Sequence, residues 1–119
     1  MRFDSHLARK ILLALEDAPP VTAPRDIVLE GRSRDDISYH IRVLYQDNMV
    51  DAVDISTVGS LHWKAKSLTA EGHKFLDEIK NDTSWAQVKT IAKTQGIRLT
   101  ISSIKGIIAQ HLKKKPASG

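Results

Sequence analysis

Three polar side chains, Tyr39, Arg42 and Gln46, recur at positions i, i+3 and i+7 and therefore share one face of a helix. Arginine can hold guanine through two hydrogen bonds, and glutamine can hold adenine in the same way. This face therefore has the chemistry to read bases in a major groove. The alternative is an ordinary solvated helix face. Asp35 lies on the same stripe and would repel phosphate, so the spacing leaves both interpretations open.

Further cations lie on both sides of this segment. Arg32 and Arg34 precede the predicted helix, and His62, Lys64 and Lys66 alternate with apolar residues on a predicted strand. Contacts from such side chains to phosphates hold a protein on a duplex without reading its sequence. Basic residues on an exposed strand face are also common because they discourage edge-to-edge aggregation.

The sequence offers little for catalysis. The five histidines, at positions 6, 40, 62, 73 and 111, are dispersed, there is no cysteine, and the six glycines are isolated. Neither a metal-ligand pattern nor a phosphate-binding loop is therefore recognisable. Asp35 and Asp36 fall at a helix start, where capping and the helix dipole explain them. We predict no enzyme, no cofactor and no metal, and we interpret His40 and Tyr45 as boundary packing residues.

The elements that position these residues begin with a helix over residues 4–17, capped by Asp4 or Ser5. A connector follows over residues 19–31, in which "DIVLEG" predicts a short strand. Ser33 caps the next helix. The apolar face of that helix consists of Ile37, Ile41, Leu44 and Asn48.

Two strand-like runs, "VDAVDIS" and "LHWKAKSLT", are separated by "TVGS" and predict a β-hairpin. Alternation predicts that Leu61, Trp63 and Ala65 pack inward while His62, Lys64 and Lys66, which alternate with them, face solvent. Three more helices are predicted in "TAEGHKFLDEIKND", "DTSWAQVKTIAKTQG" and "ISSIKGIIAQHLKKK", and glycine ends the second.

The chain has 119 residues, a net charge of +4 and 41% hydrophobic residues, as expected for one globular domain. We predict a single domain over residues 1–115 and a flexible tail over residues 116–119. No apolar run approaches the roughly 20 residues that span a bilayer, and the start lacks a signal-peptide pattern, so the cytoplasm is the expected location. Much of the excess positive charge lies in "HLKKK". This segment is either a solvated terminus or a phosphate contact.

The order of helix, short strand, helix, hairpin and three helices resembles a winged-helix domain, whose hairpin wing lies beside the DNA backbone. "ISYHIRVLYQDNMV" resembles the passage from recognition helix to wing, and "LTAEGHKFL" is similar to the segment after the wing, where glycine lets helix and sheet approach closely. The blocks "LARKILLALE", "EGRSRDDISYHIRVL" and "LTAEGHKFLDEIKNDTSW" resemble the prophage-associated family called domain of unknown function 2513. This resemblance implies an α+β, mainly α, winged-helix fold with extra C-terminal helices, a bacterial or phage origin, and no established activity.

One segment departs from that pattern, because "VTAPRDIVLEGR" lacks the signature of a positioning helix. Two hypotheses therefore stay open: a cytoplasmic regulator that binds double-stranded DNA, and a phage-encoded module that binds and modulates a host protein. The predicted DNA contacts are Arg32, Arg34, Tyr39, Arg42, Gln46, His62, Lys64 and Lys66. Leu12, Leu13 and Ile107 lie off the main apolar stripes, which leaves open either a homodimer or a closed core within one chain.

Overall fold

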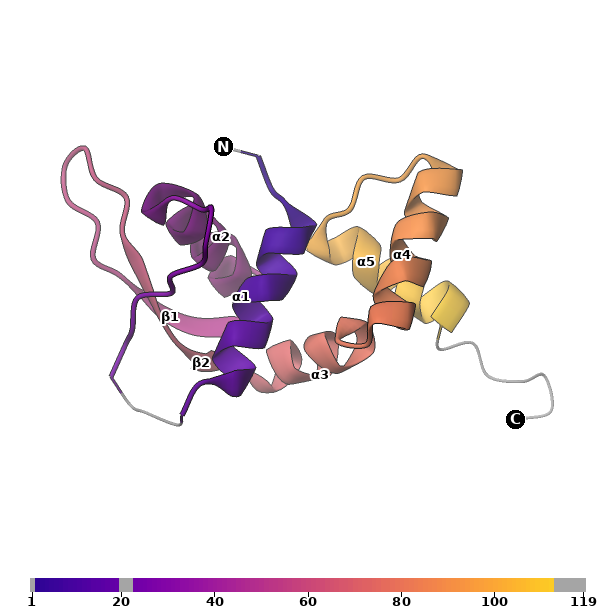
Figure 1. The fold of residues 1–119 in the computed structure, drawn as a ribbon, viewed down its shortest axis with the longest axis horizontal. Helices are drawn as coiled ribbons and strands as arrows, with labels where there is room; N and C mark the ends of the chain where they lie inside the picture. The colour runs from indigo at the N-terminus through magenta and orange to yellow at the C-terminus, as the bar shows by residue number, and fades with distance from the viewer. Residues whose placement is uncertain (1, 20–22, 113–119) are drawn as a thin grey trace.

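The first helix, α1 (Ser5–Asp17), begins where Asp4 accepts hydrogen bonds from the backbone N–H groups of His6 and Leu7. The computed structural model describes residues 2–19 and 23–112. Within these residues the fold is α+β and mainly helical, with one two-stranded antiparallel sheet (Figure 1). The predicted tail and Lys113–Lys115 lie outside the described residues.

The connector after α1 contains no strand over residues 26–31, so the prediction made from "DIVLEG" is wrong. A single residue, Arg25, pairs with Ala65 through two backbone hydrogen bonds of 2.8 and 3.0 Å. The next donor along that strand edge, the backbone N–H of Trp63, is already bound to the hydroxyl of Ser38 at 3.0 Å. The edge therefore offers the connector no second pair, and Gly31, with φ of 78°, turns the chain away.

The second helix, α2 (Arg34–Gln46), is capped by Ser33, whose hydroxyl accepts from the Asp36 N–H. Its predicted apolar face is confirmed at Ile37, Ile41 and Leu44, which are buried. Asn48 does not continue that face, because the helix ends at Gln46 and Asn48 adopts a left-handed φ of 63°. Met49 occupies the buried position instead.

The predicted hairpin is confirmed as β1 (Val50–Asp54) paired antiparallel with β2 (Trp63–Leu68). Its register is irregular: Ala52 lies opposite Ala65 and Asp51 opposite Ser67, so Lys66 is the extra residue of a β-bulge. Simple alternation along β2 therefore stops at Lys66. Of the predicted inward residues, Ala65 is buried while Leu61 and Trp63 are half-buried.

Three helices follow the sheet, as predicted: α3 (Ala70–Ile79), α4 (Asp82–Gln95) and α5 (Ile101–Ile107). The last predicted helix does not continue, because a π-helical turn, η1 (Ile108–Leu112), replaces it shortly after Gly106, a poor helix former. Along α4, Trp85, Val88 and Ala92 are buried, and Ile91 is half-buried.

Gly72 is where α3 meets the end of α2. A Cβ atom at this position would lie 1.9 Å from the carbonyl oxygen of Met49. Only glycine fits there, so the predicted close approach is confirmed.

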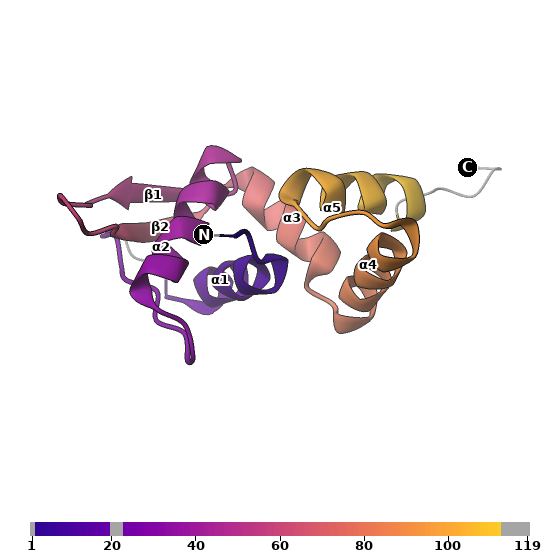
Figure 2. The same ribbon diagram turned by 90° about the horizontal axis from the view of Figure 1, so that it is seen from above.

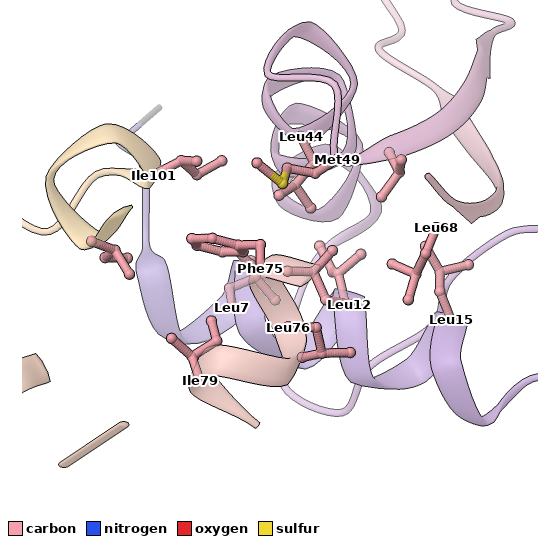
Figure 3. Packing of buried hydrophobic residues seen from close by; sticks show 14 of the residues in the cluster. Leu7, Leu12, Leu15, Leu44, Met49, Leu68, Phe75, Leu76, Ile79 and Ile101 are labelled. Atoms are coloured by element: carbon pink, nitrogen blue, oxygen red, sulfur yellow. The ribbon is translucent and has the colours of Figure 1, made fainter. Parts of the chain in front are cut away.

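One hydrophobic cluster joins both ends of the chain (Figure 3). Of the three off-stripe residues, Leu12 and Ile107 are buried in the core of one chain, and Leu13 is half-buried and packs against that core. The molecule measures 53 × 30 × 23 Å, with the hairpin at one end and α4 and α5 at the other (Figures 1 and 2). Arg9 links α1 to the end of α3, because its guanidinium donates to the carbonyls of Ile79 and Lys80 at 2.9 and 2.8 Å.

Candidate functional site

The outer face of α2 presents Tyr39, Arg42 and Gln46, as the sequence predicts. Gln46 is exposed, and the other two are half-buried. The guanidinium carbon of Arg42 lies 5.4 Å from the centre of the Tyr39 ring. The Arg42 Nε atom is buried and has no hydrogen-bond partner among the described residues. The Arg42 guanidinium thus packs against the Tyr39 ring, and its Nε–H is shielded from solvent.

An acidic side chain borders this face. Hydrogen bonds from the side chain and backbone of Ser56 lower the pKa of Asp54 below its ordinary value, and the positive charge of Arg42 adds to the effect. Asp54 ends β1, so the face of α2 continues onto the hairpin as a mixed surface of cation and carboxylate.

The two arginines before α2 have separate roles. Arg32 donates to Asp4 at 2.5 Å and to Asp36 at 3.0 Å, and these hydrogen bonds raise its pKa above the ordinary value. Arg32 therefore clamps the start of α1 to the start of α2. Arg34 donates to the hydroxyl of Ser60 at 2.7 Å and ties α2 to the hairpin loop.

The three predicted hairpin cations all lie next to carboxylates. His62 Nε2 is 2.6 Å from Asp26, and this hydrogen bond lowers the pKa of the Asp26 carboxyl. Lys64 lies 4.0 Å from the same aspartate, and Lys66 lies 4.0 Å from Asp51. The predicted basic patch is therefore partly neutralised. The sequence could not reveal this, because Asp26 is far from the hairpin along the chain.

His40, interpreted as a boundary residue, is fully buried. The backbone N–H of Asp4 donates to its Nε2 at 2.8 Å, so that nitrogen must be the acceptor and Nδ1 must carry the proton that binds the Asp36 carbonyl at 2.7 Å. The ring also stacks on Phe3 at 5.5 Å. His40 thereby fixes the segment before α1 against α2.

A groove of about 810 Å³ lies beside this fixed segment, on the side of α2 away from the hairpin. We call it the arginine groove. Its walls include Arg2, Asp4 and Ser5 near the start of α1, Tyr39 of α2, and Arg98 and Thr100 between α4 and α5. Figures 1 and 2 both place the N-terminal segment between α2 and the start of α5. Arg2 and Arg98 were not predicted, because only the tertiary fold brings them to Tyr39.

Exposed apolar side chains lie in the connector before α2 and in the loop of the hairpin. Val28, Ile55 and Val58 are 85%, 42% and 106% exposed, and we call them the hairpin patch. Val58 lies in the tight turn between Thr57 and Ser60. Beneath Val28 is a pocket of about 220 Å³ floored in part by Trp63.

Residues 2–19 and 23–112 include no cluster of three or more His, Cys, Asp or Glu side chains suited to a metal ion. None of their helices has the length and apolar character needed to cross a membrane.

Residues 2–98 match the family described as "Hypothetical protein (DUF2513)", and the chain belongs to this family. The family predicted from the three sequence blocks is thereby confirmed. The chain is also similar to an uncharacterized protein of Haemophilus influenzae strain Rd, with 33% identity over 110 residues that cover 90% of this chain and 92% of that protein. No solved structure matches.

Proposed function

We propose that this is a small cytoplasmic DNA-binding protein of the winged-helix type, a regulator of bacterial, phage or prophage origin. The observation that carries the proposal is the outer face of α2, where the exposed Gln46 and the half-buried Tyr39 and Arg42 lie beside the hairpin. An α-helix fits a major groove, which is about 12 Å wide. Arg42 is the principal base-reading residue in this proposal, because a guanidinium can hold a guanine edge through two hydrogen bonds.

The order of elements supports the proposal. The chain runs through α1, a single paired residue at Arg25, α2 and then the β1–β2 hairpin, which is the order of a winged helix without its positioning helix. Other contacts replace that helix in holding α2. Ser38 binds the backbone of Trp63, Arg34 binds Ser60, and Arg32 clamps the start of α2 to α1.

The proposed role is binding and not catalysis. The titratable side chains around α2 are occupied by one another, His62 with Asp26 and Arg32 with Asp4 and Asp36. These pairs explain the local carboxylates as parts of the scaffold.

Fluorescence anisotropy with a labelled random-sequence duplex tests the proposal. Several phosphate contacts should make the affinity fall steeply between about 50 and 200 mM salt. A selection from random duplexes would then give the preferred sequence. Undetectable binding at the lowest salt would reject the proposal.

The hairpin patch favours a second candidate, a module that binds a host protein. Exposed apolar side chains can mark a protein interface, and Val28 lines the same pocket as Trp63 of β2. A Val28→Ser/Val58→Ser variant should then lose a host protein in a pull-down while its affinity for DNA stays unchanged. If the variant instead loses duplex affinity, the patch belongs to the DNA interface.

A further inference from the structure

A helix that lies in a major groove has a sugar–phosphate backbone along each of its two sides. One side of α2 is flanked by the hairpin and the other by the arginine groove. We propose that the arginine groove seats one backbone of the bound duplex, with Arg2 and Arg98 as its phosphate contacts. This inference rests on the proposed function and adds the loop between α4 and α5 to the interface.

The ion pairs favour the arginine groove over the hairpin as the place where a phosphate binds. Lys64, Lys66 and His62 each have a carboxylate within 4.0 Å. In the described part of the chain, Arg2 and Arg98 form no ion pair. A paired cation must give up its carboxylate to contact a phosphate, whereas an unpaired cation gains the whole interaction.

The charge of the groove has the right sign for this partner. Its walls carry three arginines, Arg2, Arg32 and Arg98, and two aspartates, Asp4 and Asp36, which leaves a net charge of +1. Both aspartates bind Arg32, so their oxygens are partly engaged. The two remaining arginines are the free positive charges of the groove.

Both walls of the groove are fixed before any ligand binds. On one wall, His40 and Arg32 hold the segment around Asp4. On the other, the Ser103 hydroxyl donates to the Arg98 carbonyl at 2.5 Å, and the Ser103 and Thr100 side chains cap α5 reciprocally. The backbone of Arg98 is therefore anchored while its side chain remains exposed. The backbone of this wall therefore loses little conformational freedom on binding, and the ordering of the Arg98 side chain is the cost that remains.

The test is the salt dependence of duplex affinity for the full-length Arg2→Ala/Arg98→Ala variant, measured with the same random-sequence duplex. The slope of log affinity against log salt should fall by about two, or about one per lost phosphate contact. Arg2→Lys/Arg98→Lys should keep most of the slope, since lysine also binds phosphate as a point charge. Melting temperatures should stay unchanged, because both residues are exposed.

Two double variants provide the comparison. Lys64→Ala/Lys66→Ala removes the same charge from the hairpin and should lower the slope less. Lys74→Ala/Lys105→Ala removes it from a separate pocket between α3 and α5 and should leave the slope unchanged.

The failures of the groove and of the proposed function are distinguishable. Normal salt dependence in the Arg2→Ala/Arg98→Ala variant, with intact wild-type binding, overturns the groove alone. An equal loss of slope in the Lys74→Ala/Lys105→Ala variant would indicate a diffuse field and also overturn it. A wild-type protein that binds no duplex at low salt overturns both proposals.

Discussion

The amino-terminal and carboxy-terminal parts of this protein differ in their net charge and in the pairing of their cations. Residues 1–68 hold nine Lys and Arg against ten Asp and Glu, a net charge of −1, whereas residues 69–119 hold nine against four, a net charge of +5. In the first part the cations around α2 mostly contact carboxylates. In the second, Lys93 and Lys105 are exposed, and neither forms an ion pair within the described residues.

In the proposed function, this difference separates the residues that attract a duplex over a distance from the residues that contact its bases. Long-range attraction of a polyanion depends on net charge and would be strongest at the α4–α5 end. Recognition needs rigid, directional donors, and those lie on α2 in a part that is nearly neutral. The hairpin patch also lies in that part, so a neutral and partly apolar end suits a protein partner as well.

The largest effect is expected where the two parts meet, at Gly72. Gly72→Ala places a Cβ atom 1.9 Å from the Met49 carbonyl oxygen, so α3 must move away from the turn between α2 and β1. We expect a loss of about 3 kcal/mol or more in the free energy of unfolding, measured by urea denaturation. Gly106→Ala is the matched control, since its Cβ meets nothing within 4 Å. That change should stabilise the protein by up to about 1 kcal/mol. Equal effects at both glycines would contradict the close approach.

The next largest effect concerns Arg9, which connects the parts. Arg9→Ala removes the hydrogen bonds to the carbonyls of Ile79 and Lys80 at the end of α3. We expect a loss of about 2–3 kcal/mol in unfolding free energy, because the Ile79 carbonyl is left without this buried donor. Lys10→Ala is the control, with the same charge change at an exposed neighbour. If the two variants unfold at the same urea concentration, Arg9 does not hold the parts together.

The sequence predicts well the features that depend on local patterns. The spacing of Ile37, Ile41 and Leu44 identifies the buried face of α2, and Ser33 and Thr69 identify two helix starts. These features depend on the 3.6-residue period and on capping, which act within a few residues.

Features that depend on distant partners could not be predicted. The connector fails to form a strand because Ser38 already occupies the Trp63 N–H. The His62–Asp26 pair and the position of Arg98 beside Tyr39 likewise exist only in the tertiary fold. The uneven net charge of the two parts can be read from the sequence. It is the one sequence signal that favours phosphate contacts in the carboxy-terminal part, which contains Arg98.

A smaller effect, on binding, tests recognition by α2. Arg42→Ala should weaken binding to a selected duplex by about 1–3 kcal/mol and reduce discrimination against random duplexes. Because Arg42 lies over Tyr39 and is half-buried, its melting temperature must be measured alongside. Lys74→Ala serves as the charge-matched control. Unchanged discrimination would exclude Arg42 as a base-reading residue.

The smallest effect concerns the ion pair that borders the arginine groove. Burial opposes the ionisation of Asp4, but hydrogen bonds from Arg32 and the Leu7 N–H outweigh it and hold the pKa of Asp4 below its ordinary value of 3.8. The fold therefore favours the ionised carboxylate. The resulting stability is present above the ordinary pKa and is lost as the pH falls through the lower, folded-state pKa.

Asp4→Asn isolates this charge, because asparagine also caps helices well. At neutral pH the variant should lose less than about 1 kcal/mol, as is usual for a partly exposed pair. Urea denaturation repeated from pH 7 to about pH 2 should show the two stabilities converging in acid, where the wild-type carboxylate is protonated too. Asp35→Asn, in the first turn of α2, controls for the general effect of removing a carboxylate. A gap between Asp4→Asn and the wild type that persists in acid would show that the cap, and not the charge on Asp4, holds the start of α1 beside the groove.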